Sequence, residues 1–183
     1  KDAQILELVG NILTNGSAGL IDLNLVKSQK LLSAYAFPYV LKDYSMLILQ
    51  GNPTQGQSLD QVKELLLGQI AKLRSGDFSD ELIQSIVNNE KKNDIAQNED
   101  YSSRASNLMD NFTSEVDWST AISYPDMISK ITKKDIMDFA TKYLKDNNYV
   151  IIYKKKGEDK DIVKVDKPTI TPVSVNKEQS AFV

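Results

Sequence analysis

The sequence predicts an α+β fold of two layers, in which helices pack on one face of a mostly antiparallel sheet. Three observations favour this class. Two neighbouring segments rich in strand-forming residues are separated by a short turn, which is typical of an antiparallel hairpin. Amphipathic helical segments then follow one another without strands between them, and one strand-like segment comes after the last helix. Strands and helices therefore do not alternate as they do in a doubly wound parallel sheet.

The first part of the chain is predicted to form two helices. In residues 2–14 the apolar side chains recur with a helical period, and Asn15-Gly16 ends the segment. Residues 18–29 predict a second, shorter helix. The side chains expected to face the core are Ile5, Leu8, Val9, Ile12 and Leu13 in the first helix and Leu20, Leu23 and Val26 in the second.

The predicted hairpin consists of residues 31–40 and 44–50, which are rich in strand-forming side chains. Lys42-Asp43 between them suits a turn. Pro38 lacks a backbone N–H, so its position late in the first strand indicates an edge strand or a bulge.

Three helices are expected after the hairpin. Ser58 with Gln61 three residues later is a capping box, and it begins a helix that continues to about residue 74. Ser79 caps the next helix, which continues to about residue 98. A third helical segment covers residues 101–114.

The C-terminal part is predicted to be irregular over residues 118–126 and helical over 133–144, where Thr132 with Asp135 caps the helix. Residues 148–156 predict a strand that pairs with residues 161–165.

Composition excludes several classes of function. The chain has 183 residues, a net charge of −3 and an isoelectric point near 5.1, which does not suit a nucleic-acid-binding surface. It contains no cysteine and no histidine, so disulfides are excluded, and so are the commonest zinc ligand and the commonest general base. No apolar segment approaches the ~20 residues that a membrane span needs.

One segment partly matches the sequence motif of a phosphate-binding loop. Residues 51–58 have the spacing of the P-loop motif, but Gln57 stands where the lysine that contacts the phosphates is required. The segment is interpreted as a strand-to-helix connection that ends at the helix cap Ser58.

The acidic residues form no recognisable catalytic or metal-binding pattern. They are spaced unlike a calcium loop, and no histidine is present to activate a serine. We therefore assign no catalytic residue and no metal ligand, and substrate-binding residues stay unassigned. The acidic residues interpreted as part of a solvated helical surface are Glu99, Asp100, Asp110, Glu115 and Asp117.

Four aromatic residues of the C-terminal half are interpreted as core, with a binding groove as the alternative. They are Tyr101, Phe112, Trp118 and Tyr124.

Three segments in the same order resemble peptidases of the insulinase (pitrilysin-like, M16) family. Residues 5–37 resemble a helix, a Gly-rich turn, a short helix and a strand of that family, and residues 44–93 resemble its next strand, loop and two helices, with Asp80-Glu81-Leu82 as the acidic opening motif. Residues 128–157 resemble its closing helix and strand. The residues that match there are Ile128, Ile131, Thr132, Asp135, Ile136, Ala140, Tyr143 and Leu144.

The resemblance implies the fold of the LuxS/MPP-like metallohydrolases and a non-catalytic domain. Without histidine the chain cannot carry the family's H-x-x-E-H zinc motif, and the arginine and tyrosine of its second signature align with Val26 and Ser33, with Tyr35 two residues further on. Residues 1–157 are then the inactive domain without its leading strands, and 158–183 are the end of a hairpin and a linker to a following domain.

The implied function is to shape the peptide-binding chamber of a zinc metallopeptidase, with zinc and proteolysis supplied by the full-length protein. The alternative is a non-proteolytic assembly or peptide-binding subunit of the same family. The expected partners are other domains of the same chain and extended peptide, which pairs with a strand edge in residues 31–40 or 44–50. The missing leading strands are also expected to leave a sheet edge unpaired, which predicts either self-association or pairing of that edge with residues 166–183 of the same chain. The family's bacterial members imply a periplasmic or envelope location.

Overall fold

A computed structural model describes residues 1–41, 43–157, 166–173 and 178. The chain divides into two compact units, Lys1–Ile151 and Ile152–Val183. All helices and strands of the described residues lie in the first unit, and the described residues of the second adopt neither.

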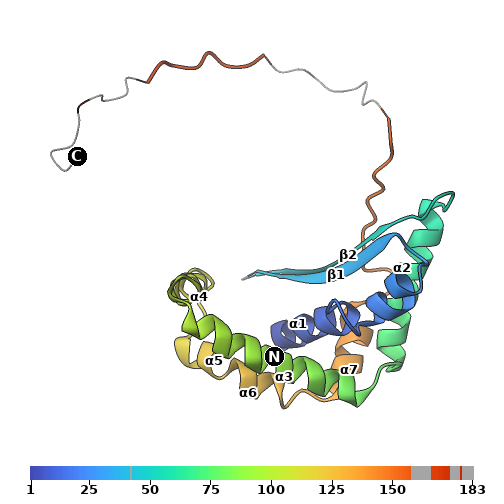
Figure 1. The fold of residues 1–183 in the computed structure, drawn as a ribbon, viewed down its shortest axis with the longest axis horizontal. Helices are drawn as coiled ribbons and strands as arrows, with labels where there is room; N and C mark the ends of the chain where they lie inside the picture. The colour runs from blue at the N-terminus through green and yellow to red at the C-terminus, as the bar shows by residue number, and fades with distance from the viewer. Residues whose placement is uncertain (42, 158–165, 174–177, 179–183) are drawn as a thin grey trace. The chain divides into compact units, whose positions relative to one another are not determined.

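The elements confirm the predicted α+β class, with helices and one antiparallel two-stranded sheet (Figure 1). In chain order they are α1 (Asp2–Leu13), the π-helix η1 (Asp22–Lys27), β1 (Ser33–Val40), β2 (Ser45–Asn52), α2 (Leu59–Ser75), α3 (Asp80–Glu99), α4 (Tyr101–Thr113), α5 (Trp118–Ile122), α6 (Tyr124–Ile128) and α7 (Lys133–Tyr143).

The hairpin pairs β1 with β2 in a register that runs from Ser33 opposite Asn52 to Val40 opposite Ser45. Its helix-facing side packs on α1 and α2, as Figure 1 shows. Ala34 and Ala36 of β1 are buried in this contact, because their small side chains let the strand approach α1 closely.

Helix α1 is the centre of the core. It contacts β1 on one side and α3, α6 and α7 on others, and its apolar residues are almost fully buried. The predicted inward residues Ile5, Leu8, Val9, Ile12 and Leu13 are all confirmed.

The predicted helix caps are confirmed by their hydrogen bonds. The Ser58 hydroxyl accepts from the Gln61 backbone N–H, and the Gln61 side chain accepts from the Ser58 N–H. Thr132 and Asp135 make the equivalent pair at α7. Both helices therefore begin where local side-chain chemistry satisfies their first N–H groups.

The second predicted helix has a different register from the one expected. Residues 22–27 form a π-helix, in which Leu25 is 1% exposed and Leu23 is 48% exposed. The prediction that Leu23 faces the core was therefore wrong. The buried carboxylate of Asp22 accepts the backbone N–H groups of Asn15 and Gly19, which binds the start of this segment to the end of α1.

Two further predictions were wrong. Residues 118–126, expected to be irregular, belong largely to the short helices α5 and α6, because the Asp117 side chain caps α5 and Pro125 lies in the first turn of α6. Residues 148–156, expected to be a strand, form none. Lys42 of the expected turn and the expected strand 161–165 lie outside the described residues.

Candidate functional site

The loop between β2 and α2 is a structural connection. The Gln57 side chain accepts the Thr54 N–H at 3.0 Å and donates to the Lys30 carbonyl at 3.1 Å, and Ser58 caps α2. The residue at the lysine position of the P-loop pattern thus holds the loop itself, in agreement with the interpretation from sequence.

No side-chain group suited to a metal ion is found in the part of the chain that the structure describes, where histidine, cysteine, aspartate and glutamate never gather in threes. Of the acidic residues noted in the sequence, Asp100 and Asp117 cap α4 and α5 and accept backbone N–H groups. The pKa of the Asp100 carboxyl is lowered mainly by the Ser103 backbone N–H, and the pKa of the Asp117 carboxyl mainly by the Ser119 hydroxyl and then by the Ser119 N–H, since these hydrogen bonds favour the charged form. No described helix is long and apolar enough to span a bilayer.

The face of the hairpin turned away from the helices carries a stripe of exposed aromatic side chains. Tyr35, Phe37 and Tyr39 alternate along β1 and are each more than a third exposed. Met46 lies opposite Tyr39, and the Tyr35 hydroxyl donates to the Gln50 side chain across the strands. We call the side chains of Tyr35, Phe37, Tyr39, Met46, Ile48 and Gln50 the solvent face of the hairpin.

The outer edge of β1 is closed to strand pairing. The Ala36 N–H donates to the Thr14 hydroxyl at 2.9 Å, so it points away from β2. Since N–H directions alternate along a strand, Ala34, Pro38 and Val40 also face this edge. Pro38 has no N–H to offer, and Ala36 has already used its own. The edge prediction for Pro38 is therefore confirmed, and this edge is a poor template for an added strand.

Among the described residues, the outer edge of β2 is open. Leu49 lies opposite Ala36, so its N–H also points away from the partner strand, and the same alternation applies to Leu47 and Gly51. Within the described residues, β2 pairs with no strand other than β1. We call the outward N–H and C=O groups of Leu47, Leu49 and Gly51 the open edge. The sequence left residues 31–40 and 44–50 as alternative edges for strand pairing, and the free backbone groups lie on the second of these, in β2.

Helix α4 exposes its apolar side. Tyr101, Leu108, Met109 and Phe112 lie on the surface, with Phe112 85% exposed, whereas the half-buried positions of this helix are Ser103, Asn107 and Asn111. Trp118 in α5 is also exposed. The interpretation of these aromatic residues as core was therefore wrong for Tyr101, Phe112 and Trp118.

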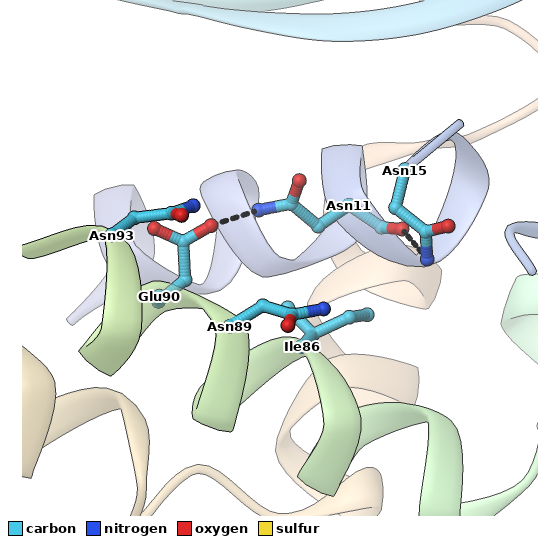
Figure 2. Close-up of a pocket in the computed structure, with 6 residues that line it drawn as sticks. All are labelled: Asn11, Asn15, Ile86, Asn89, Glu90 and Asn93. Atoms are coloured by element: carbon cyan, nitrogen blue, oxygen red, sulfur yellow. Dashed lines mark hydrogen bonds between the residues drawn. The ribbon is translucent and has the colours of Figure 1, made fainter. Parts of the chain in front are cut away.

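Tyr124, the fourth aromatic residue, is partly buried and its hydroxyl donates to Glu7 of α1 at 2.5 Å. Burial and the negative charge of Glu90 raise the pKa of the Glu7 carboxyl, and the Tyr124 hydrogen bond opposes them. Next to this pair, a polar cavity lies between α1 and α3 (Figure 2), where Asn11 Nδ2 donates to Glu90 Oε1 at 3.2 Å. No pattern in the sequence indicated Glu7, Asn11 or Glu90 as members of a site.

The raised pKa of Glu7 predicts how stability depends on pH. Above the ordinary glutamate value of 4.5 the folded state binds more protons than the unfolded state, so Glu7 makes the free energy of unfolding fall as the pH rises through its folded pKa. Glu7→Gln keeps an acceptor for Tyr124 and removes the charge. We expect the variant to match the parent near pH 4 and to be more stable at pH 7 in urea melts; a difference that stays constant across this range would contradict the assignment.

The positions aligned with the family's arginine and tyrosine hold no comparable group. Val26 packs partly buried against the core, and Ser33 begins β1, where its hydroxyl accepts from Asn52. Tyr35 lies on the solvent face with its hydroxyl on Gln50. Val26, Ser33 and Tyr35 therefore do not form a pair of side chains that could bind a substrate carbonyl as the family's arginine and tyrosine do.

Solved structures share this fold. A protease from Helicobacter pylori matches with a TM-score of 0.74 and 21% identity, over 81% of this chain and 36% of that chain. The inactive peptidase domain of a protein assigned as a zinc protease from Bordetella parapertussis matches with a TM-score of 0.69 and 19% identity, over 80% of each chain. A protein assigned as a zinc protease from Bordetella pertussis matches with a TM-score of 0.68 and 19% identity, over 80% of this chain and 81% of that one.

These matches define the class of fold, which is that of domains found in zinc-protease-like proteins. The chain spans about a third of the length of the Helicobacter pylori protease. A scan against protein-family models and a search of curated proteins found no match.

Proposed function

We propose that this chain is a non-catalytic domain of a zinc metallopeptidase of the insulinase family, and that it holds extended peptide in the chamber of the full-length protein. The observation that carries the proposal is the open edge of β2 beside the aromatic solvent face. Main-chain hydrogen bonds at such an edge bind a peptide regardless of its sequence, and side chains on the adjoining face supply apolar contact.

The lack of the usual zinc ligands in this chain supports a non-catalytic role. Zinc in catalytic sites is held mainly by histidine, with carboxylate or cysteine as further ligands, and this chain has no histidine or cysteine. The residues present therefore do not fit the metal of the family, and we place zinc and proteolysis elsewhere in the full-length protein. The likeness to an inactive peptidase domain from Bordetella parapertussis is consistent with this role.

The exposed apolar side of α4 supports a role as one domain of a larger protein. Apolar patches that are large and exposed are typical of interfaces, and Tyr101, Leu108, Met109 and Phe112 gather on one side of this helix. The Helicobacter pylori chain, of which the matched fold is about a third, offers a precedent for such an arrangement. A zinc motif elsewhere in the full-length sequence distinguishes a peptidase from the alternative, a non-proteolytic peptide-binding subunit.

Substitutions at Leu49 test peptide pairing directly. Leu49→Pro removes the outward N–H without removing a hydrogen bond to β1, whereas Leu49→Ala removes the same side-chain packing and keeps the N–H. We expect the proline variant to bind a labelled unstructured peptide about tenfold more weakly than the alanine variant, the scale of one or two lost hydrogen bonds.

Fluorescence anisotropy measures the binding, and mass spectrometry of the same samples shows whether the peptide stays intact. Equal affinity of the two Leu49 variants would exclude the open edge as the binding site. Cleavage of the peptide by the purified chain would contradict the non-catalytic role.

A further inference from the structure

The cavity between α1 and α3 is a second polar site, on the side of α1 away from the hairpin (Figure 2). Its volume is about 180 Å³. Five of its six lining residues carry an amide or a carboxylate, and only one is apolar. They are Asn11 and Asn15 from α1 and the turn after it, and Ile86, Asn89, Glu90 and Asn93 from α3.

The carboxylates beside this cavity form no ion pair with a described residue. Glu90 accepts one hydrogen bond from Asn11, and a carboxylate can accept several more. Glu7 lies close enough for the charge of Glu90 to raise its pKa. Neither carboxylate forms an ion pair among the residues whose positions are described. A cationic group that entered the cavity would therefore meet an uncompensated charge.

The asparagine side chains of the cavity differ in how many hydrogen bonds they already form within the chain. Asn15 is committed to the fold, because its side chain accepts from the backbone of Ser17 and Ala18 and donates to the Asn11 carbonyl. Asn89 and Asn93 are exposed, and the described residues supply no hydrogen bond to either side chain. The side-chain amides of Asn89 and Asn93 and the Oδ1 atom of Asn11 can therefore still form hydrogen bonds with a ligand.

The spacing of Asn89 and Asn93 suits a polypeptide backbone. Four residues along a helix cover about 6 Å, and two residues of an extended chain cover about 6.6 Å. Side-chain amides one turn apart can therefore each meet alternate peptide groups, and each amide offers both a donor and an acceptor.

We propose that the cavity binds an arginine side chain of an extended polypeptide. The guanidinium donates to the Glu90 carboxylate and to the amide oxygen of Asn11, and the amides of Asn89 and Asn93 pair with the peptide groups on either side. A guanidinium suits this set because its planar fork of donors reaches a carboxylate and a neighbouring oxygen together. The site is separate from the open edge of β2, and this proposal does not depend on the proposed function.

An NMR titration of the 183-residue chain tests the assignment. The probes are the tripeptides acetyl-Gly-Arg-Gly-amide and acetyl-Gly-citrulline-Gly-amide, which differ in charge and hardly in shape. We expect the arginine peptide to shift the side-chain amide signals of Asn11, Asn89 and Asn93, and to bind about tenfold more tightly than the citrulline peptide.

Glu90→Gln is the critical variant. It keeps an acceptor for Asn11 and removes the charge, so a thermal melt should show an intact fold while arginine binding falls about tenfold. Glu99→Gln, at the end of α3 and outside the cavity, is the matched control and should bind as the parent does.

Three outcomes would overturn the proposal. Equal binding of the arginine and citrulline peptides would remove the role of charge, and signal shifts confined to β2 would place the peptide elsewhere. A lysine peptide that bound as well as the arginine peptide would contradict the selection of a guanidinium.

Discussion

Leu25→Ala is expected to lower the free energy of unfolding by about 2–5 kcal/mol, the range for truncating a large buried side chain. Leu25 is 1% exposed in the π-helix η1 and belongs to the core cluster. Two positions earlier, Leu23 is 48% exposed, so Leu23→Ala should change stability by less than about 1 kcal/mol.

Urea denaturation of the two leucine variants distinguishes the register of the structure from the one expected from helical periodicity. An α-helix over residues 18–29 would place Leu23 inward, so the opposite order of the two effects would mean that the segment is not a π-helix.

Gly10→Ala is expected to destabilise the chain by about 1–3 kcal/mol, against the usual preference of helices for alanine. Gly10 lies within α1 where Pro38 of β1 crosses it, and an added Cβ would lie 2.6 Å from Pro38 Cδ and 3.2 Å from its Cγ. Because the proline ring is rigid, relief requires α1 and the hairpin to move apart.

Gly68→Ala provides the matched control. Gly68 also lies inside a helix, α2, but an added Cβ would have no neighbour within 4 Å. It should therefore stabilise the chain by up to about 1 kcal/mol, the difference in helix propensity. Thermal or urea melts measure both variants, and stabilisation by both would mean that α1 and β1 are not in close contact at Pro38.

The features that could be predicted from sequence are those governed by neighbouring residues. The capping pairs Ser58 with Gln61 and Thr132 with Asp135 depend on side chains three positions apart, and both form. The hairpin was predictable because two strand-forming segments meet through a short turn, and they pair in a continuous register.

The features that could not be predicted depend on packing and on turn hydrogen bonds that no repeating pattern signals. In the segment of the π-helix, the buried carboxylate of Asp22 accepts the backbone N–H groups of Asn15 and Gly19, which lie in the turn between α1 and η1. Residues 148–156 have the composition of a strand, but they pair with neither described strand, and composition alone does not determine pairing. The aromatic residues of α4 face outward although their type favours burial, because that helix packs through Ser103, Asn107 and Asn111.

The candidate sites were predictable only in part. The sequence indicated that a hairpin edge would be available, but the choice of β2 required the hydrogen bond between Ala36 and Thr14, residues 22 positions apart. The cavity between α1 and α3 brings Asn11 next to Glu90, 79 positions away, and no local motif signals such a meeting.

Hydrogen exchange at the open edge tests the central claim most directly. In the free chain the amide protons of Leu47, Leu49 and Gly51 should exchange quickly, whereas those of Ile48 and Gln50, which point to β1, should be protected. An excess of unfolded peptide should slow exchange at Leu47, Leu49 and Gly51 and leave the peptide uncleaved. If these three amides exchange at the same rate with and without peptide, this domain does not hold peptide at the edge of β2.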